Sequence, residues 1–234
     1  MNNPVLLELL FIIITAFSYF IGRAIYRRTK WMLLHTVIVA TAIVILLCSI
    51  CGAGMELYEE NTKVLKYLLN ISVVAFGYLL HKHYEYIKKR GVAIFAATFL
   101  GSLTALITIV FPSLLAGSDA ETIITLMPKS VTNPIAIVLS DQHGGDIYLT
   151  SVMVIIAGIF GAITGPWFLK ITGIGSHLAK GLALGSASHG IGTAKALEMG
   201  AIEGAAGGLA IALMGLFTSL LVPLFVKLLS VILN

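Results

Sequence analysis

The distribution of charged residues divides the chain into long apolar runs separated by short polar segments. Four runs contain no Asp, Glu, Lys or Arg, namely residues 31–55, 92–118, 147–169 and 204–226. Each reaches the roughly 20 residues that an α-helix needs to cross the hydrocarbon core of a bilayer. Two shorter runs, Leu9–Gly22 and Tyr67–Leu80, reach that length if the charged ends of Glu8 and Lys66 extend to the membrane interface. The pattern therefore predicts six membrane-spanning helices.

The composition points to the same fold class. Of the 234 residues, 58% are hydrophobic and 11% are charged, and the mean hydropathy is +0.99. A soluble domain carries roughly 25% charged residues, so much of the surface of this chain must face lipid. We expect an all-α polytopic integral membrane protein, and the composition excludes a soluble enzyme.

Basic residues gather in two short loops of the N-terminal part, from Arg23 to Lys30 and from Lys88 to Arg90. Loops rich in Lys and Arg stay on the cytoplasmic side of a membrane. We therefore expect both loops in the cytoplasm, the N-terminus outside the cell and the first helix retained as an anchor. Because these loops carry much of the net charge of +4, the charge indicates orientation, and we expect no nucleic-acid partner.

Beyond position 115, polar residues, glycine and proline interrupt the apolar runs in the middle rather than at the ends. We therefore treat the chain as one membrane domain, residues 1–234, with scaffold helices in 1–115 and a distinct C-terminal half in 116–234. The first interruption contains Pro128 and Pro134. Each proline removes a backbone donor and clashes with the preceding helical turn, which favours two half-helices with an extended link.

The second interruption is residues 185–193, in a region where ten of the 23 glycines fall between Gly173 and Gly208. Irregular backbone at membrane depth occurs where it is buried in protein or lines a cavity, and broken helices form the binding sites of many transporters. We expect a site where 128–134 and 186–193 meet. If both interrupted segments, 120–140 and 173–199, cross the membrane, the chain has eight spans. If they re-enter, it has fewer, so we predict about six to eight transmembrane helices.

The first candidate cluster is Lys129 with Ser130, Thr132 and Asn133. An ammonium at membrane depth is costly unless it is paired or hydrated, so Lys129 would attract a carboxylate; alternatively the span ends near 128 and Lys129 lies at the interface. The three neutral residues would add hydrogen-bond donors to a ligand. Equally, they could cap the half-helix that starts at Pro134.

The second candidate cluster is Ser188, His189 and Thr193, with Gly190 and Gly192 between them. A neutral imidazole can donate to an anion or relay a proton; alternatively, a backbone carbonyl accepts a hydrogen bond from His189. We expect no catalytic role, since no acid is placed by the sequence to orient the histidine ring.

The remaining polar groups favour structural roles. Lys195 and Glu198, three apart on a helix, favour an ion pair at a helix end, with ion coupling as the alternative. We interpret Asp141, His143 and Asp146 as a polar turn rather than a metal site. The C-x-x-C formed by Cys48 and Cys51 lacks a thioredoxin-like context, so we expect two small apolar residues on one helix face. We expect neither a metal nor a cofactor.

Two stretches carry a family resemblance. Pro128-Lys129-Ser130-Val131-Thr132, and more specifically the run from Ala187 to Glu198, resemble the signature segments of the LrgB/CidB family of bacterial membrane proteins. The span pattern is similar over essentially the whole chain. The ending Ala194 to Met199 is closer to the CidB branch. The resemblance implies location in the bacterial cell membrane.

The resemblance implies two functions of different classes. One is holin-like or antiholin-like modulation of murein hydrolase activity, autolysis and cell death, with a small LrgA/CidA-type membrane protein as partner and with homo-oligomers left open. The other is transport, because family members are implicated in pyruvate uptake and a plastid relative exchanges glycolate and glycerate. The two buried polar interruptions favour a carrier of small 2-oxo or 2-hydroxy monocarboxylates. Proton symport, sodium coupling and exchange all stay open.

Overall fold

The computed structural model describes residues 4–29, 31, 34, 36–65, 67–68, 71, 78, 81–82 and 84–233. Among these residues the regular elements are helices, with no β-strand. Four helices are long and apolar enough to cross a membrane, namely α1 (Pro4–Thr29), α6 (Gly91–Leu115), α9 (Ile147–Ile171) and α11 (Ala201–Ile232). The structure is that of an all-helical membrane protein.

Three of the four charge-free runs coincide with long helices, α6, α9 and α11. The run 31–55 differs, because its described helix, α2 (Thr36–Ile50), has 15 residues, fewer than the roughly 20 that cross a bilayer core. Gly52 has a φ of 65°, and the Ala53 N–H donates to Cys48 O at 2.9 Å. A glycine in this conformation ends a helix.

The fourth long helix is α1, which extends the predicted run Leu9–Gly22 in both directions. The predicted run Tyr67–Leu80 lies largely outside the described residues. The total of six to eight spans therefore stays a prediction.

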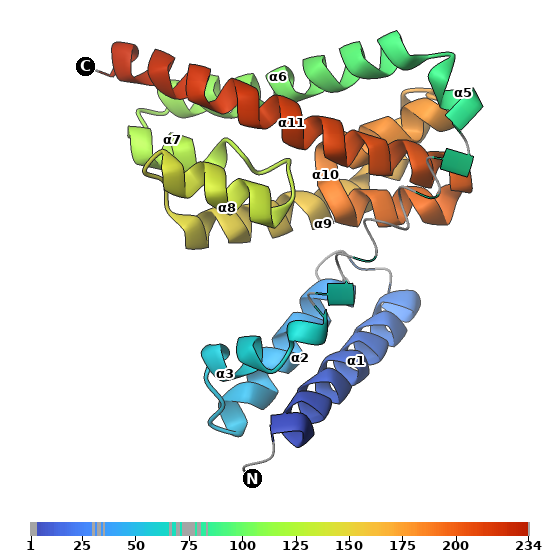
Figure 1. The fold of residues 1–234 in the computed structure, drawn as a ribbon, viewed down its shortest axis with the longest axis vertical. Coiled ribbons are helices and arrows are strands. Elements are labelled where there is room, and N and C mark those ends of the chain that lie inside the picture. Colours follow the sequence, from blue (N-terminus) through green and yellow to red (C-terminus); the bar gives the residue numbers. More distant parts are fainter. Residues whose placement is uncertain are drawn as a thin grey trace. The chain divides into compact units, whose positions relative to one another are not determined.

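The chain divides into two compact units, Met1–Val74 and Ala75–Asn234. The first unit contains α1, α2 and α3 (Met55–Glu60) (Figure 1). A Cβ added at Gly22 of α1 would lie 2.5 Å from Thr36 O at the start of α2, so these two helices approach closely. The hydroxyls of Thr15 and Tyr58 lie 2.8 Å apart and join α1 to α3. Cys48 and Cys51 are free thiols, one buried and one exposed.

The second unit contains α5 (Tyr84–Lys88), α6, α7 (Ala120–Leu126), α8 (Asn133–Gln142), α9, α10 (His177–Met199) and α11. In this unit α6 packs with the later helices, so the structure groups it with residues beyond position 115. Figure 1 shows α6 and α11 running side by side, with α7 and α8 near one end and α10 near the other.

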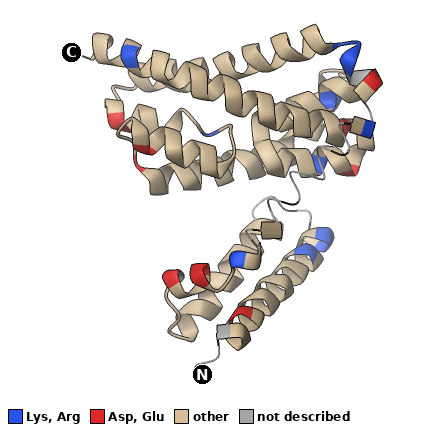
Figure 2. Ribbon diagram, viewed as in Figure 1, with Lys and Arg blue, Asp and Glu red and all other residues tan. Residues whose placement is uncertain are grey.

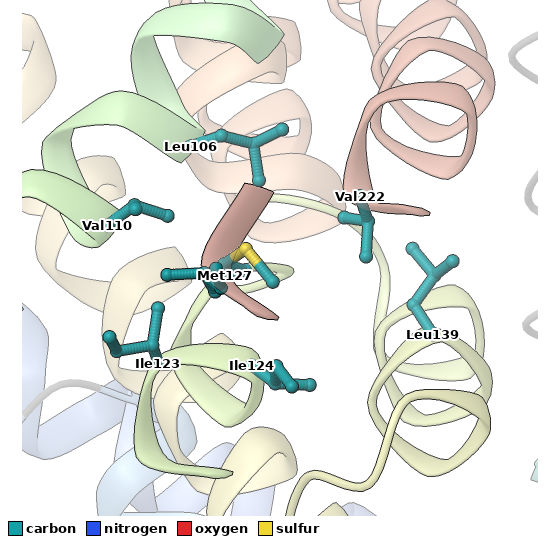
Figure 3. Close-up of a cluster of buried hydrophobic side chains, with 8 residues drawn as sticks. Leu106, Val110, Ile123, Ile124, Met127, Leu139 and Val222 are labelled. Atoms are coloured by element: carbon teal, nitrogen blue, oxygen red, sulfur yellow. The ribbon is translucent and has the colours of Figure 1, made fainter. Parts of the chain in front are cut away.

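One end of the second unit is held by a cluster of buried apolar side chains. Leu106 and Val110 of α6 meet Met127 and Leu139 from the α7–α8 segment and Val222 of α11 (Figure 3). The opposite end is held by a second cluster, in which Ile94, Leu178 and Ala205 bring together the first turns of α6, α10 and α11. Each end of the second unit therefore has its own cluster of buried apolar side chains.

The segment α7–link–α8 folds back, so that the chain after α8 lies beside the last turn of α7. The Asp146 N–H, just before α9, donates to Thr125 Oγ1 at 2.8 Å, and Thr150 Oγ1 of α9 donates to Thr125 O at 2.9 Å. The chain therefore leaves α7 and comes back beside it before entering α9. We call this segment, residues 120–142, the first hairpin.

Helix α10 also reverses direction, at a kink where Ser188 and His189 have non-helical backbone angles. Before the kink, Gly185 packs against the Gly207 backbone of α11. After it, Thr193 packs against that same Gly207, and Leu197 packs against Gly204. Before the kink α10 runs in the same direction as α11, since Gly181 lies against Glu203 and Gly185 against Gly207. After the kink it runs in the opposite direction, from Gly207 back to Gly204. We call residues 177–199 the second hairpin.

Charged residues mark the two ends of the second unit differently (Figure 2). The end with the base of the first hairpin carries Asp119, Glu121, Asp141 and Asp146 with one lysine, Lys227. The end with the base of the second hairpin carries Lys170, Lys180 and Lys195 together with Glu198 and Glu203. The basic segment Lys88 to Arg90 precedes α6 at this second end.

Candidate functional site

The tips of the two hairpins meet on α9. Val131 of the first hairpin packs with Val154 of α9 and Met214 of α11 in one buried cluster. From the second hairpin, His189 Nε2 lies 3.0 Å from the carbonyl oxygen of Val154. Val154 therefore joins the two interrupted segments, whose meeting the sequence predicted.

The kink of the second hairpin is seated against glycines of α9. His189 has φ 41° and ψ −129°, a sparsely populated conformation that costs roughly 1–3 kcal/mol. A Cβ added at Gly158 would lie 2.7 Å from the His189 ring, and one at Gly161 would overlap the Ser188 hydroxyl. Because these two glycines have no side chains, the kink can pack directly against the backbone of α9.

His189 makes the carbonyl hydrogen bond that the sequence left as an alternative to ligand contact. Because a carbonyl only accepts, Nε2 of His189 carries the proton and donates to Val154 O. In a neutral ring Nδ1 is then the acceptor. His189 is 7% exposed, so the hydrogen bond holds a nearly buried residue.

Three buried polar atoms near the tips have no hydrogen-bond partner within the described chain: Ser188 Oγ, Thr193 Oγ1 and Asn133 Oδ1. Ser188 and Thr193 are each 0% exposed. A buried polar group without a partner costs roughly 1–3 kcal/mol, and such groups in native proteins call for a bound molecule or water. All three belong to the residues that the sequence proposed for ligand binding.

The link of the first hairpin places Lys129 beside Ser130, with Nζ 3.3 Å from Oγ. Thr132 is the N-cap residue of α8, but its side chain makes no capping hydrogen bond. The first intrahelical bond runs from Ala136 N to Thr132 O, and Pro134 has no N–H. Among the described residues, the N–H groups of Asn133 and Ile135 at the start of α8 therefore lack an intrahelical or capping partner, and the helix dipole makes such groups attractive to an anion.

The two glycines after the kink differ in their surroundings. A Cβ at Gly192 would overlap Leu184 O and press on Ser188, whereas nothing lies within 4 Å of one at Gly190. Gly192 thus permits the reversal of the chain. Gly190 borders open space at the tip.

The other polar candidates lie away from the tips. Lys195 donates to Glu198 at 2.8 Å, and both side chains are exposed. Asp146 accepts from the N–H groups of Tyr148 and Leu149 as the N-cap of α9. His143 Nδ1 bonds to Leu139 O. Among the described residues, no three His, Cys, Asp or Glu side chains are grouped as metal ligands.

Sequence reasoning missed several residues around the tips and the base. Ser102 of α6 donates to the Met214 sulfur at 3.1 Å in the buried centre. At the base of the second hairpin, His177 Nδ1 donates to Glu203 Oε1 at 2.5 Å, and Glu203 is 3% exposed. Gly158, together with the G-x-x-x-G that begins at Gly161, was the available signal for the close packing of the kink against α9.

Comparison with known proteins finds one family model and several relatives that match nearly the whole chain. Residues 15–228 match the LrgB-like family. The chain is 30% identical over 226 residues to the holin-like protein CidB of Staphylococcus epidermidis, covering 97% of this chain and 99% of that protein. It is 33% identical over 220 residues to the uncharacterized protein YxaC of Bacillus subtilis, covering 94% and 96%.

A third relative is the antiholin-like protein LrgB of Bacillus cereus, 29% identical over 215 residues, which are 92% of this chain and 94% of that protein. No solved structure matches the chain. The family match agrees with the similarity to CidB and LrgB proteins over at least 94% of their lengths and with the two signature segments at the hairpin tips. The chain belongs to the LrgB-like family.

Proposed function

We propose that this protein carries small organic acids, pyruvate, glycolate or similar 2-oxo or 2-hydroxy monocarboxylates, across the membrane. The observation that supports this most is the pair of hairpins that approach from opposite ends and meet at Val154, with buried hydroxyls lacking partners beside them. Carriers commonly bind substrate near the bilayer midplane at broken helices that enter from opposite sides.

The depth of the site suits a carrier. Helix α9 has 25 residues, about 37 Å at 1.5 Å per residue. Val154, Gly158 and Gly161, which contact the tips, are about 10 to 21 Å from the start of α9 on the same scale. In this proposal both hairpins re-enter rather than cross, and the N-terminus of the chain lies outside the cell.

The electrostatics suit an anion. The start of α8 points its unsatisfied N–H groups toward the tip of the first hairpin, and the helical run after His189 begins at the tip of the second. Both are positive ends of helix dipoles. In this proposal Lys129 supplies the counter-charge and Ser130, Thr132 and Asn133 surround it.

Each remaining residue of the second hairpin receives a role in the proposal. The hydroxyls of Ser188 and Thr193 donate hydrogen bonds to the substrate, His189 fixes the kink, and Gly190 leaves room for the substrate. Lys195 and Glu198 form an exposed ion pair at 2.8 Å, so we assign them no part in binding. The proposal requires no cofactor, metal or catalytic residue.

The names of the relatives favour a second function. CidB is named holin-like and LrgB antiholin-like, which supports modulation of murein hydrolase activity, autolysis and cell death more directly than it supports acid transport. In that role the protein would act with a small LrgA/CidA-type membrane protein or with further copies of itself. A holin-like lesion has no need for the buried unpaired polar atoms at the tips.

Uptake by proteoliposomes tests the first function against the second. Purified protein is reconstituted, and uptake of labelled pyruvate, glycolate and lactate is measured with and without a pH gradient, beside release of a trapped dye. The variants are Lys129→Gln and Ser188→Ala, with Lys227→Gln as matched control, because Lys227 is an exposed lysine far along α11.

A carrier gives saturable uptake that both site variants lose and the control keeps, without dye release. Dye release that ignores the site variants, with no selective uptake, supports the holin-like function and refutes the carrier. If neither activity is seen, the same comparison is repeated with the small LrgA/CidA-type protein co-reconstituted.

A further inference from the structure

A cavity of about 390 Å³ lies at the base of the second hairpin, where α9 ends and α10 begins. Two lysines line it, Lys170 from the last turn of α9 and Lys180 from the first turns of α10. Its other walls are apolar and include Pro166, Leu169 and Met199. The cavity is separate from the hairpin tips.

The turn after α9 shapes this cavity. Gly173 has φ 70°, and its N–H donates to Lys170 O at 3.2 Å while the Ile174 N–H donates to Leu169 O at 3.0 Å. This is the hydrogen-bond pattern of a Schellman helix end, in which the residue after the glycine folds back onto the helix. Ile174 accordingly packs on the buried Leu169 and forms part of the cavity wall.

The charge of the cavity is not balanced from within the described part of the chain. Lys195 pairs with Glu198 and His177 with Glu203, whereas no carboxylate of a described residue pairs with Lys170 or Lys180. Two ammonium groups on an apolar cavity are complementary to an anion that also carries an apolar part.

The surroundings identify the kind of anion. Lys170 is at the end of a membrane-spanning helix whose last turn exposes Trp167, Phe168 and Ile171 by 62%, 55% and 58%. Such large apolar side chains beside a basic cavity face acyl chains in a bilayer. The cavity lies at the same end of the second unit as the start of α6, which follows the basic segment Lys88 to Arg90. By the positive-inside rule this is the cytoplasmic end.

We propose that this cavity binds the phosphate headgroup of an anionic phospholipid, held between Lys170 and Lys180, with an acyl chain along the outer face of the last turn of α9. Basic pockets at the cytoplasmic ends of membrane helices recognise such headgroups. The site does not depend on whether the hairpin tips carry organic acids.

Lipid binding is measured by native mass spectrometry on the full chain in a neutral detergent. The probes are phosphatidylglycerol and phosphatidylcholine with the same acyl chains. Each lysine near a membrane surface contributes about fivefold to anionic-lipid affinity, so the double variant Lys170→Gln with Lys180→Gln should bind phosphatidylglycerol about 30-fold more weakly. The matched control, Lys63→Gln with Lys227→Gln, removes the same charge outside the cavity and should bind as the unchanged protein does.

The charge-preserving pair Lys170→Arg with Lys180→Arg should retain binding, which separates loss of charge from loss of fold. Equal binding of the two lipids, or an equal loss in the control pair, would overturn the proposal. Displacement of phosphatidylglycerol by an equal concentration of glycerol 3-phosphate would overturn it as well, because the cavity would then recognise the free phosphate rather than a lipid.

Discussion

Replacing Gly185 with alanine should force the first run of α10 away from α11. A Cβ at this position would lie 2.5 Å from Gly207 O, 2.8 Å from Gly207 Cα and 2.9 Å from Ala210 Cβ. Two of these neighbours are backbone atoms, which cannot rotate out of the way. The substitution therefore tests whether the second hairpin is built on a close approach of backbones.

The magnitude follows from the distances. Carbon atoms in contact prefer about 3.5–4.0 Å, so against the 2.8 Å to Gly207 Cα the two helices must separate by roughly 0.7 Å or more. Overpacking of this kind costs about 1–3 kcal/mol. A Cβ at Gly190, also in α10, meets nothing within 4 Å, and alanine in a helix is up to about 1 kcal/mol more favourable than glycine.

The assay is equilibrium unfolding in mixed micelles, followed by circular dichroism for the unchanged protein, Gly185→Ala and Gly190→Ala. We expect the free energy of unfolding to fall by about 1–3 kcal/mol in the first variant and to stay level or rise in the second. If Gly185→Ala is as stable as the unchanged protein, or if Gly190→Ala loses as much, the close packing of the second hairpin on α11 is refuted.

Three further predictions concern the rest of the second unit. Thr150→Val removes the buried hydrogen bond to the carbonyl of α7 and should lower the unfolding free energy by about 1–3 kcal/mol; unchanged stability would contradict the closure of the first hairpin. Gly158→Ala should displace the His189 ring and reduce acid uptake by about fivefold, the equivalent of one lost hydrogen bond; uptake at the original rate would refute its role. Hydrogen bonds from the side chain and the backbone N–H of Thr122 lower the pKa of Asp119. The stability that the Asp119 carboxylate gives the fold is therefore present above the unfolded-state pKa of about 3.9 and is lost as pH falls through the lower folded-state pKa. The melting temperature of Asp119→Asn should then depend less on pH in this range than that of the unchanged protein, and parallel curves would count against it.

The sequence by itself determined the class of the protein and the places where its helices are interrupted. Apolar runs without charge can lie only in lipid or in a core, so α6, α9 and α11 could be located from composition alone. Pro128 and Pro134 mark the end of α7 and the start of α8 because a proline ring is incompatible with a helix interior. These are local rules, and they apply whatever the rest of the chain does.

The tertiary structure decided which way the chain runs after each interruption. A kink at His189 can continue a helix or reverse it, and only the packing of Gly185 and Thr193 on the same Gly207 shows the reversal. Gly158 and Gly161 pack against His189 and Ser188, about 30 residues further along the chain. Because lipid-facing and protein-facing sides of a membrane helix are both apolar, the hydrophobic pattern gives little indication of which side packs inward, and the contacts between helices settle it.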